Sequence, residues 1–361
     1  MKIAGIDHLE LYVGDARQTA FYLCTAFGFT VCGQGGPETG LAGCRSLLLR
    51  QGGIQIVLTT GLVPDHPATE YVRRHGDGVA VIGIAVDDVA AAHRGLVDRG
   101  AEPLAPPTEY AGGDARVVVA EVSGFSDVTH RLVERHGPAR EFLPGAIALT
   151  GPDPHADGKL LRTIDHIAIC VPAGGLTPTV DYYVDVFGFT QVFEEYVEVG
   201  GQGMESKVVQ SPSQQVTFTL LEPDPNRKPG QIDNFLSWHA GAGVQHVAFG
   251  TDDIVKAVTT LAEHGVQFLG TPAAYYGNLE ERVGHLDASL ADLRRLGILV
   301  DRDHWGQLLQ IFTESMHIRR TLFLELIERR GALTFGTRNI KALYEAKQGE
   351  LAGAPNPGEG T

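Results

Sequence analysis

Two distant stretches of the chain carry the same alternation of apolar and polar residues. Residues 6–13 (IDHLELYV) and 164–171 (IDHIAICV) each predict a strand, because alternating side chains point to opposite faces of a sheet. An amphipathic segment follows each strand and leads to the motif FGFT, at 27–30 and again at 187–190. The offset is 158 residues at the strands and 160 at FGFT, so the sequence indicates an internal duplication.

A second pair of matching segments lies later in each copy. Residues 78–88 and 243–253 align at an offset of 165, and each predicts a strand, an Asp-Asp helix start and a helix that ends at a glycine. In the second copy, the helix before FGFT is expected over 176–187, with Gly188 ending it. The pattern predicts an α+β fold of duplicated βαβββ modules, two in each half.

Pro- and Gly-rich stretches suggest where the halves begin and end. We expect an N-terminal domain of two modules at 1–137, a linker at 138–162 and a C-terminal domain at 163–347. Residues 348–361 show no periodicity and are expected to form a flexible tail.

Composition narrows the class of partner and the compartment. The 361 residues include 29 Lys and Arg against 44 Asp and Glu, a formal charge of −15, which argues against nucleic acid or an anionic membrane surface as partner. The chain shows neither a signal-peptide pattern nor an apolar run of about 18 residues, so no membrane association is expected. Four cysteines without a CxxC pair favour a reducing cytoplasm.

Alignment of the two halves brings out three positions with different chemistry. Residues 133–137 align with 327–331 at an offset of 194, which fixes the last of the three. The second half has His166, His246 and Glu325 where the first half has His8, Val81 and Arg131. Only the second half therefore has a predicted metal site.

Two imidazoles and one carboxylate are typical of non-haem Fe(II) enzymes that activate O₂, because this set leaves open positions on the ion. Glu325 lies in the apolar run 321–327, where an isolated carboxylate is unfavourable unless paired or coordinated. The absence of sulfur ligands argues against structural zinc. A lone histidine that begins a strand is more often a packed residue than a ligand, and we expect this of His8.

Other catalytic motifs are absent. The sequence contains no HExxH, GxSxG, P-loop or GxGxxG pattern. The charged stretch 301–304 (DRDH) is expected to be a solvated turn.

The second half resembles the 4-hydroxyphenylpyruvate dioxygenase family, whose fold is the vicinal-oxygen-chelate (glyoxalase-like) open barrel. The resemblance rests on several stretches in order: IDH at 164–166, GAGVQH at 241–246, PAAYY at 272–276, GILVD at 297–301, LLQIFT at 308–313 and FLELIER at 323–329. It implies two open-barrel domains, with Fe(II) held by His166, His246 and Glu325. It further implies O₂ and the 2-oxo acid 4-hydroxyphenylpyruvate as substrates.

The same resemblance implies a pocket and a lid. Its implied substrate-binding residues are Ser206, Gln231, Gln245, Gln310, Phe312 and Phe323. The terminal stretch 335–344 matches a helix that closes over the site, and the implied specificity and lid residues are Leu221, Thr334, Phe335, Asn339, Ile340 and Tyr344.

Departures from the family pattern point to one branch of it. The chain reads Leu-Glu-Pro at 221–223 where the dioxygenases have Asn-Glu-Pro, and Asn-Ile at 339–340 where they have Asn-Phe. Both changes resemble the branch that forms 4-hydroxymandelate and CO₂ by oxidative decarboxylation and benzylic hydroxylation. This resemblance also implies a role in making a precursor of a peptide antibiotic. The alternatives are homogentisate formation, extradiol ring cleavage, and a non-enzymatic small-molecule binder of the same fold. A homodimer is a further expectation.

Overall fold

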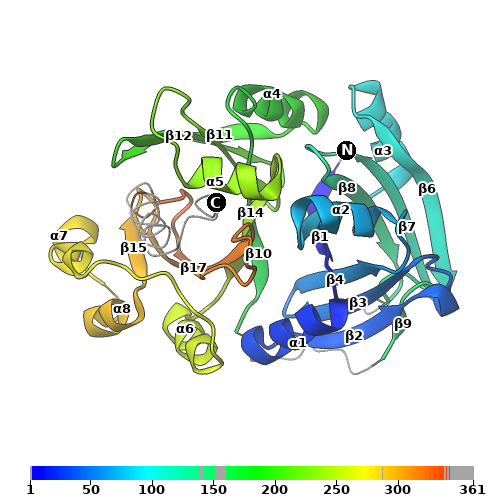
Figure 1. The fold of residues 1–361 in the computed structure, drawn as a ribbon, viewed down its shortest axis with the longest axis horizontal. Coiled ribbons are helices and arrows are strands. Elements are labelled where there is room, and N and C mark those ends of the chain that lie inside the picture. The colour runs from blue at the N-terminus through cyan, green and yellow to red at the C-terminus, as the bar shows by residue number, and fades with distance from the viewer. Residues whose placement is uncertain are drawn as a thin grey trace, which may run out of the picture.

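The fold consists of two similar halves that lie side by side (Figure 1). The computed structural model describes residues 2–138, 141–150, 160–286, 288–336, 339 and 341. Each half has one curled sheet, of nine strands in the order β6-β7-β8-β5-β1-β4-β3-β2-β9 and of eight in the order β11-β12-β13-β10-β14-β17-β16-β15. No helix of the described residues is long and apolar enough to cross a membrane.

The first half contains two modules in sequence order. Its elements are β1 (Ile3–Tyr12), α1 (Ala16–Phe27), β2 (Thr30–Gly35), a 3₁₀ turn (Pro37–Thr39), β3 (Cys44–Gln51), β4 (Ile54–Gly61), α2 (Pro67–His75), β5 (Gly78–Val86), α3 (Val89–Asp98), β6 (Pro103–Gly112), β7 (Ala115–Ser123) and β8 (Thr129–His136).

The second half repeats this order with extra short helices before its last three strands. Its elements are β10 (Thr163–Cys170), α4 (Leu176–Asp181), a π turn (Tyr182–Val186), β11 (Thr190–Val199), β12 (Gln202–Gln210), β13 (Thr217–Pro223), α5 (Gln231–His239), β14 (Gly243–Gly250), α6 (Ile254–Glu263), a 3₁₀ turn (Ala273–Tyr276), α7 (Leu279–Val283), α8 (Leu290–Leu296), β15 (Leu299–Arg302), β16 (Gln307–Phe312) and β17 (Phe323–Arg330).

Strand pairing confirms the predicted duplication. β1 pairs in parallel with β4 and antiparallel with β5, and β10 pairs in the same two ways with β13 and β14. The helix expected over 176–187 is α4 continued by the π turn, and Gly188 follows it with a φ of 73° that suits glycine. FGFT leads into β2 in one half and β11 in the other, as predicted.

The described part of the expected linker packs against the first sheet. Residues Ala148–Leu149 form the short strand β9, which pairs with β2. Phe142 and Ile147 are buried in an apolar cluster with residues of β2, β3 and β4. These apolar side chains pack against the first sheet and so bury apolar surface. The composition of 138–162 does not predict this packing. The expected tail, 348–361, lies outside the described residues.

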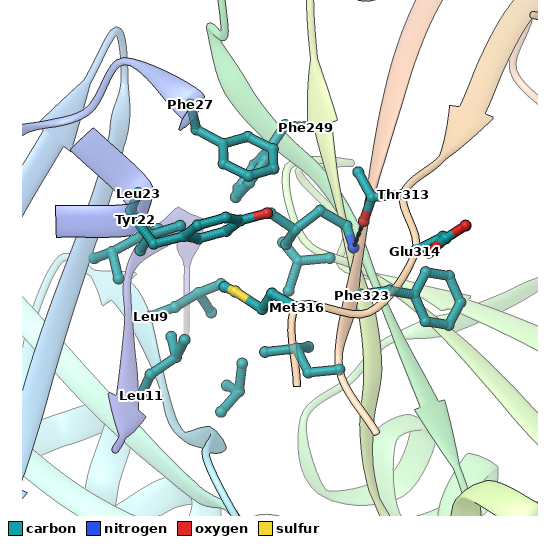
Figure 2. A pocket seen from close by; sticks show the side chains of 15 residues that line it. Leu9, Leu11, Tyr22, Leu23, Phe27, Phe249, Thr313, Glu314, Met316 and Phe323 are labelled. Carbon is teal, nitrogen blue, oxygen red and sulfur yellow. Dashed lines mark hydrogen bonds between the residues drawn. The ribbon is translucent and has the colours of Figure 1, made fainter. Parts of the chain in front are cut away.

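The halves meet through a shared apolar core. Figure 2 shows a cavity at this boundary, where Tyr22 and Leu9 of the first half face Met316 and Phe249 of the second. Elsewhere at the boundary the His130 imidazole lies 2.9 Å from the Tyr183 hydroxyl.

Candidate metal centre

Three neighbouring strands bring the predicted ligands together. His166 on β10 and Glu325 on β17 both lie opposite Ala248 of β14, and His246 stands two residues before Ala248, on the same face. The His166 Nε2 and His246 Nε2 atoms lie 3.3 Å and 3.4 Å from Glu325 Oε2. All three side chains are buried. Among the described residues, this is the one cluster with ligand spacing suited to a metal ion.

Hydrogen bonds fix which imidazole nitrogen faces the centre. His166 Nδ1 lies 2.9 Å from Asp165 Oδ1, and His246 Nδ1 lies 3.2 Å from Gln245 Oε1. Arg329 in turn donates to both oxygens of Asp165, at 2.7 Å and 2.9 Å. Since an acceptor holds a proton on Nδ1 of each ring, Nε2 is the nitrogen that faces the centre, and it would present its lone pair to an ion that displaces the Nε2 proton.

The charges of the cluster depend on one another. Burial disfavours the imidazolium of His166, but the Glu325 and Asp165 carboxylates outweigh it and raise the pKa of His166 to about 9. Burial would raise the pKa of Glu325, yet the neighbouring imidazoles lower it, so this carboxylate is anionic. A buried anion with two nitrogen donors is the charge pattern that a divalent cation neutralises.

The residues fit a metal on two independent grounds. Cis ligands at about 2.1 Å from an ion lie about 3 Å apart, close to the separations found here. Glu325 Oε1 is buried and has no hydrogen-bond partner, although unsatisfied buried carboxylate oxygens are strongly unfavourable. An ion held by His166, His246 and Glu325 would compensate that oxygen, and the N, N, O donor set suits Fe(II).

A pocket with about 490 Å³ of empty space adjoins the cluster. Besides the three ligands, it is lined by Met204, Ser206, Thr219, Leu221, Gln231, Gln245, Gln310, Phe312, Ile327 and Phe335.

Known proteins with this architecture include several oxygenases. The model of the Glyoxalase/Bleomycin resistance protein/Dioxygenase superfamily matches residues 5–133 and 163–311. A probable 4-hydroxyphenylpyruvate dioxygenase 2 of Aspergillus fumigatus is 38% identical over 96% of this chain and 94% of its own. A 4-hydroxyphenylpyruvate dioxygenase of Xenopus tropicalis is 34% identical over 96% and 91%. A solved variant of 4-hydroxymandelate synthase from Streptomyces coelicolor is 43% identical, with a TM-score of 0.89 and coverage of 97% and 100%.

The chain belongs to the 4-hydroxyphenylpyruvate dioxygenase family. This confirms the resemblance, the fold class and the prediction of a dioxygenase. Each half supplies one of the two matched segments, as the duplication requires.

Within this family fold, most of the expected pocket residues surround one space. Ser206, Gln231, Gln245, Gln310, Phe312, Leu221 and Phe335 all line the pocket. Phe323 instead stacks behind His246, with ring centroids 4.9 Å apart, and lines the cavity between the halves (Figure 2).

Sequence reasoning missed Thr219 as a pocket residue. Its hydroxyl is buried and has no hydrogen-bond partner, a property it shares with Ser206 Oγ and Gln231 Oε1. Only the alternation of β13, which turns Thr219 and Leu221 to the same face, could have indicated it. These three unpaired oxygens belong to residues that line one pocket, together with apolar side chains and the amides of Gln245 and Gln310.

The residues expected at the lid have different surroundings. The Phe335 ring stands edge-on to His166 at 5.2 Å. Asn339 is buried, accepts a hydrogen bond from Tyr275 at 2.7 Å and donates one to Gln310 at 3.3 Å. Thr334 does not line the pocket, while Ile340, Tyr344 and most of the expected lid helix lie outside the described residues.

The expectation of a solvated turn at 301–304 is right only for Asp303 and His304, which lie in the bend between β15 and β16, with His304 exposed. Residues 301–302 belong to β15, and Asp303 Oδ2 accepts hydrogen bonds from the backbone of Leu333 and Thr334, at 2.7 Å and 2.9 Å. Arg329 holds the same segment by donating to the Thr334 carbonyl at 2.7 Å. The charged side chains thus fix the segment that carries Phe335, because its backbone groups need partners that no strand supplies.

At the equivalent place in the first half, the described residues form no metal-ligand cluster. Arg131 lies opposite Gly83, as Glu325 lies opposite Ala248, and donates to Glu10 at 2.7 Å. His8 is buried, bonded to Asp7 at 2.7 Å and 3.3 Å from Arg131. The guanidinium supplies the positive charge that an ion would supply in the second half.

Proposed function

We propose that the protein converts 4-hydroxyphenylpyruvate and O₂ into 4-hydroxymandelate and CO₂, with Fe(II) as cofactor. In this reaction one oxygen atom of O₂ enters the new carboxylate and the other becomes the benzylic hydroxyl. The proposal rests on Leu221, a buried aliphatic residue in the pocket wall where the homogentisate-forming enzymes have an amide. The whole-chain similarity to a 4-hydroxymandelate synthase supports it.

The three ligand residues would hold Fe(II), which supplies a Lewis-acidic site for the 2-oxo acid and the electrons that activate O₂. Asp165 and Gln245 hold the two imidazoles in the orientation that this requires. Hydrogen bonds with His166 and Arg329 hold the pKa of the Asp165 carboxyl below its ordinary value despite burial, so this residue is anionic.

The pocket offers complementary groups to the phenol end of the substrate. Gln231 Oε1 can accept the phenolic hydrogen, and the hydroxyls of Ser206 and Thr219 can donate to the phenolic oxygen. Phe312 and Leu221 provide apolar walls for the ring. Binding therefore satisfies buried oxygens that have no protein partner, which favours a hydroxylated ring over an unsubstituted one.

Leu221 is the group we assign to product choice. Benzylic hydroxylation needs the side-chain carbon nearest the reacting centre, whereas homogentisate formation needs the ring carbon there. An aliphatic side chain cannot hold the ring through a hydrogen bond as an amide does, so the ring can rotate to bring the benzylic carbon closer. A displacement of about 1 Å is enough to redirect a positioned reaction.

Product identification tests the proposal directly. The protein is incubated with Fe(II), O₂ and 4-hydroxyphenylpyruvate, and the aromatic protons of the product are recorded by NMR. 4-Hydroxymandelate keeps the symmetric pattern of a para-disubstituted ring, while its isomer homogentisate shows three distinct ring protons. Homogentisate as the main product would refute the proposal, and turnover that survives complete iron chelation would refute the assigned cofactor.

A further inference from the structure

The first half retains a large cavity at the place that corresponds to the metal pocket. The space is about 880 Å³, including the part open to solvent, and residues of the first curled sheet line it. Ser46, which lies opposite Thr59, corresponds by strand register to Ser206, which lies opposite Leu221.

The walls of the cavity divide into an apolar side and a charged side. The apolar side consists of Leu41, Val57, Phe142, Leu143 and Ile147. On the charged side, Arg131 bonds Glu10 at 2.7 Å and Glu121 at 2.8 Å. Such a division suits a small molecule with an apolar body and one polar end.

Hydrogen bonds order the buried part of the charged side. Thr59 donates to Glu10 Oε1 at 2.6 Å, and the Ser46 hydroxyl lies 2.8 Å from the Thr59 hydroxyl. Ser46, Thr59 and Glu10 are all more than nine-tenths buried. Both oxygens of Glu10 thus have protein partners, and the ion pair with Arg131 is fixed in place.

The charged side chains of the cavity wall indicate the sign of the charge that a ligand would carry. The cavity wall carries two carboxylates, of Glu10 and Glu121, against the single guanidinium of Arg131. Arg131 contacts Glu121 through Oε1 alone, so Oε2 stays available, and the Glu121 side chain is 26% exposed. The surplus negative charge disfavours a carboxylate or phosphate ligand, while the guanidinium excludes a metal ion from the equivalent of the iron position.

We propose that this cavity is a second small-molecule site, which binds an organic amine with an apolar body. The ammonium group lies against Glu121 and the apolar body against Phe142 and Val57. The site is separate from the metal centre and does not depend on the reaction proposed there.

Calorimetric titration of the full-length, iron-loaded protein tests the site with two probes of the same shape. 2-Phenylethylamine carries an ammonium group where 2-phenylethanol carries a hydroxyl. We expect saturable binding of the amine, with the alcohol binding roughly tenfold more weakly or worse, because a charge-assisted hydrogen bond is lost. Equal affinity for the two probes, or no saturable binding of the amine at millimolar concentration, would overturn the proposal.

Three variants locate the binding. Glu121→Gln keeps the shape of the side chain and should weaken amine binding roughly tenfold, without affecting the alcohol. Glu109→Gln is the matched control, because Glu109 is an exposed residue of β6 that does not line the cavity. Thr108→Trp adds a large side chain at an exposed residue of the cavity wall and should weaken both probes. An unchanged affinity in Glu121→Gln or Thr108→Trp, or an equal loss in Glu109→Gln, contradicts the proposed location.

Discussion

Asp303 fixes the segment that carries Phe335, and replacing it should loosen the cover of the metal pocket. Its carboxylate accepts five hydrogen bonds, from the backbone of Trp305, Gly306, Leu333 and Thr334 and from the Thr334 hydroxyl. Asp303→Ala removes every acceptor, whereas Asp303→Asn removes the charge and keeps one carbonyl oxygen. We therefore expect the alanine variant to be the more severe.

The structure sets the size of the effect. Although burial opposes ionisation, the four backbone N–H groups lower the pKa of Asp303 from 3.8 to about 2, a difference worth about 2.5 kcal/mol before screening. Asp303 is partly exposed, so solvent screening reduces this contribution to about 1 kcal/mol. The contribution is complete above the unfolded pKa near 4 and is lost as the pH falls through 2.

Hydrogen exchange followed by mass spectrometry measures this local stability. Exchange of the peptide that contains Leu333 and Thr334 should accelerate about fivefold in Asp303→Ala at neutral pH, with kcat/KM falling by a similar factor. Asp292→Asn serves as control, since its partner Arg295 is exposed and the pair lies on the surface helix α8. Unchanged exchange in Asp303→Ala, or an equal acceleration in the control, would refute the assigned role.

Three other perturbations test separate parts of the molecule. Leu221→Asn, combined with Ile340→Phe, should raise the share of homogentisate measured by NMR, and a product that stays entirely mandelate contradicts the assignment of product choice. Glu325→Gln should lower Fe(II) affinity at least about 100-fold in equilibrium dialysis, while Glu314→Gln should not. Burial lowers the pKa of His130 to about 3, so the unfolded chain binds a proton there below pH 6.5 that the folded protein does not. As the pH is lowered from 6 to 4, the free energy of unfolding of the wild type, measured with urea, should therefore fall. The fall should exceed that of His130→Gln by up to about 1.4 kcal/mol per pH unit.

The sequence suffices for the modules and the metal ligands because both follow from strand periodicity and the repeat. His166, His246 and Glu325 occupy inward positions whose counterparts in the first half have other chemistry, so comparing the halves exposes them. Thr219 shows the limit of this comparison, since its counterpart Val57 is apolar and a threonine within a strand has no distinctive signal.

Contacts between segments distant in the sequence could not be predicted from it, for a physical reason. Asp303 acts on residues 30 positions away, and Phe142 and Ile147 pack from a stretch whose Pro and Gly content is typical of a linker. Composition indicates only the local preferences of the backbone. Both of these features depend on the tertiary structure, which determines the backbone groups that still need hydrogen-bond partners and the apolar surfaces that still need to be buried.

The second half has Glu325 at the position where the first half has Arg131. This difference explains how the same fold forms a metal site in one half and an ion-paired cavity in the other. In the second half, the buried carboxylate is balanced by two imidazoles and leaves one oxygen for an ion. In the first half, the guanidinium stands at that register position and must itself be balanced, which Glu10 and Glu121 do from β1 and β7. Since a buried charge requires compensation, a change of sign at one position requires new partners around it. The ion triad therefore balances the charge inside a barrel that holds no metal and leaves its cavity open to a different ligand.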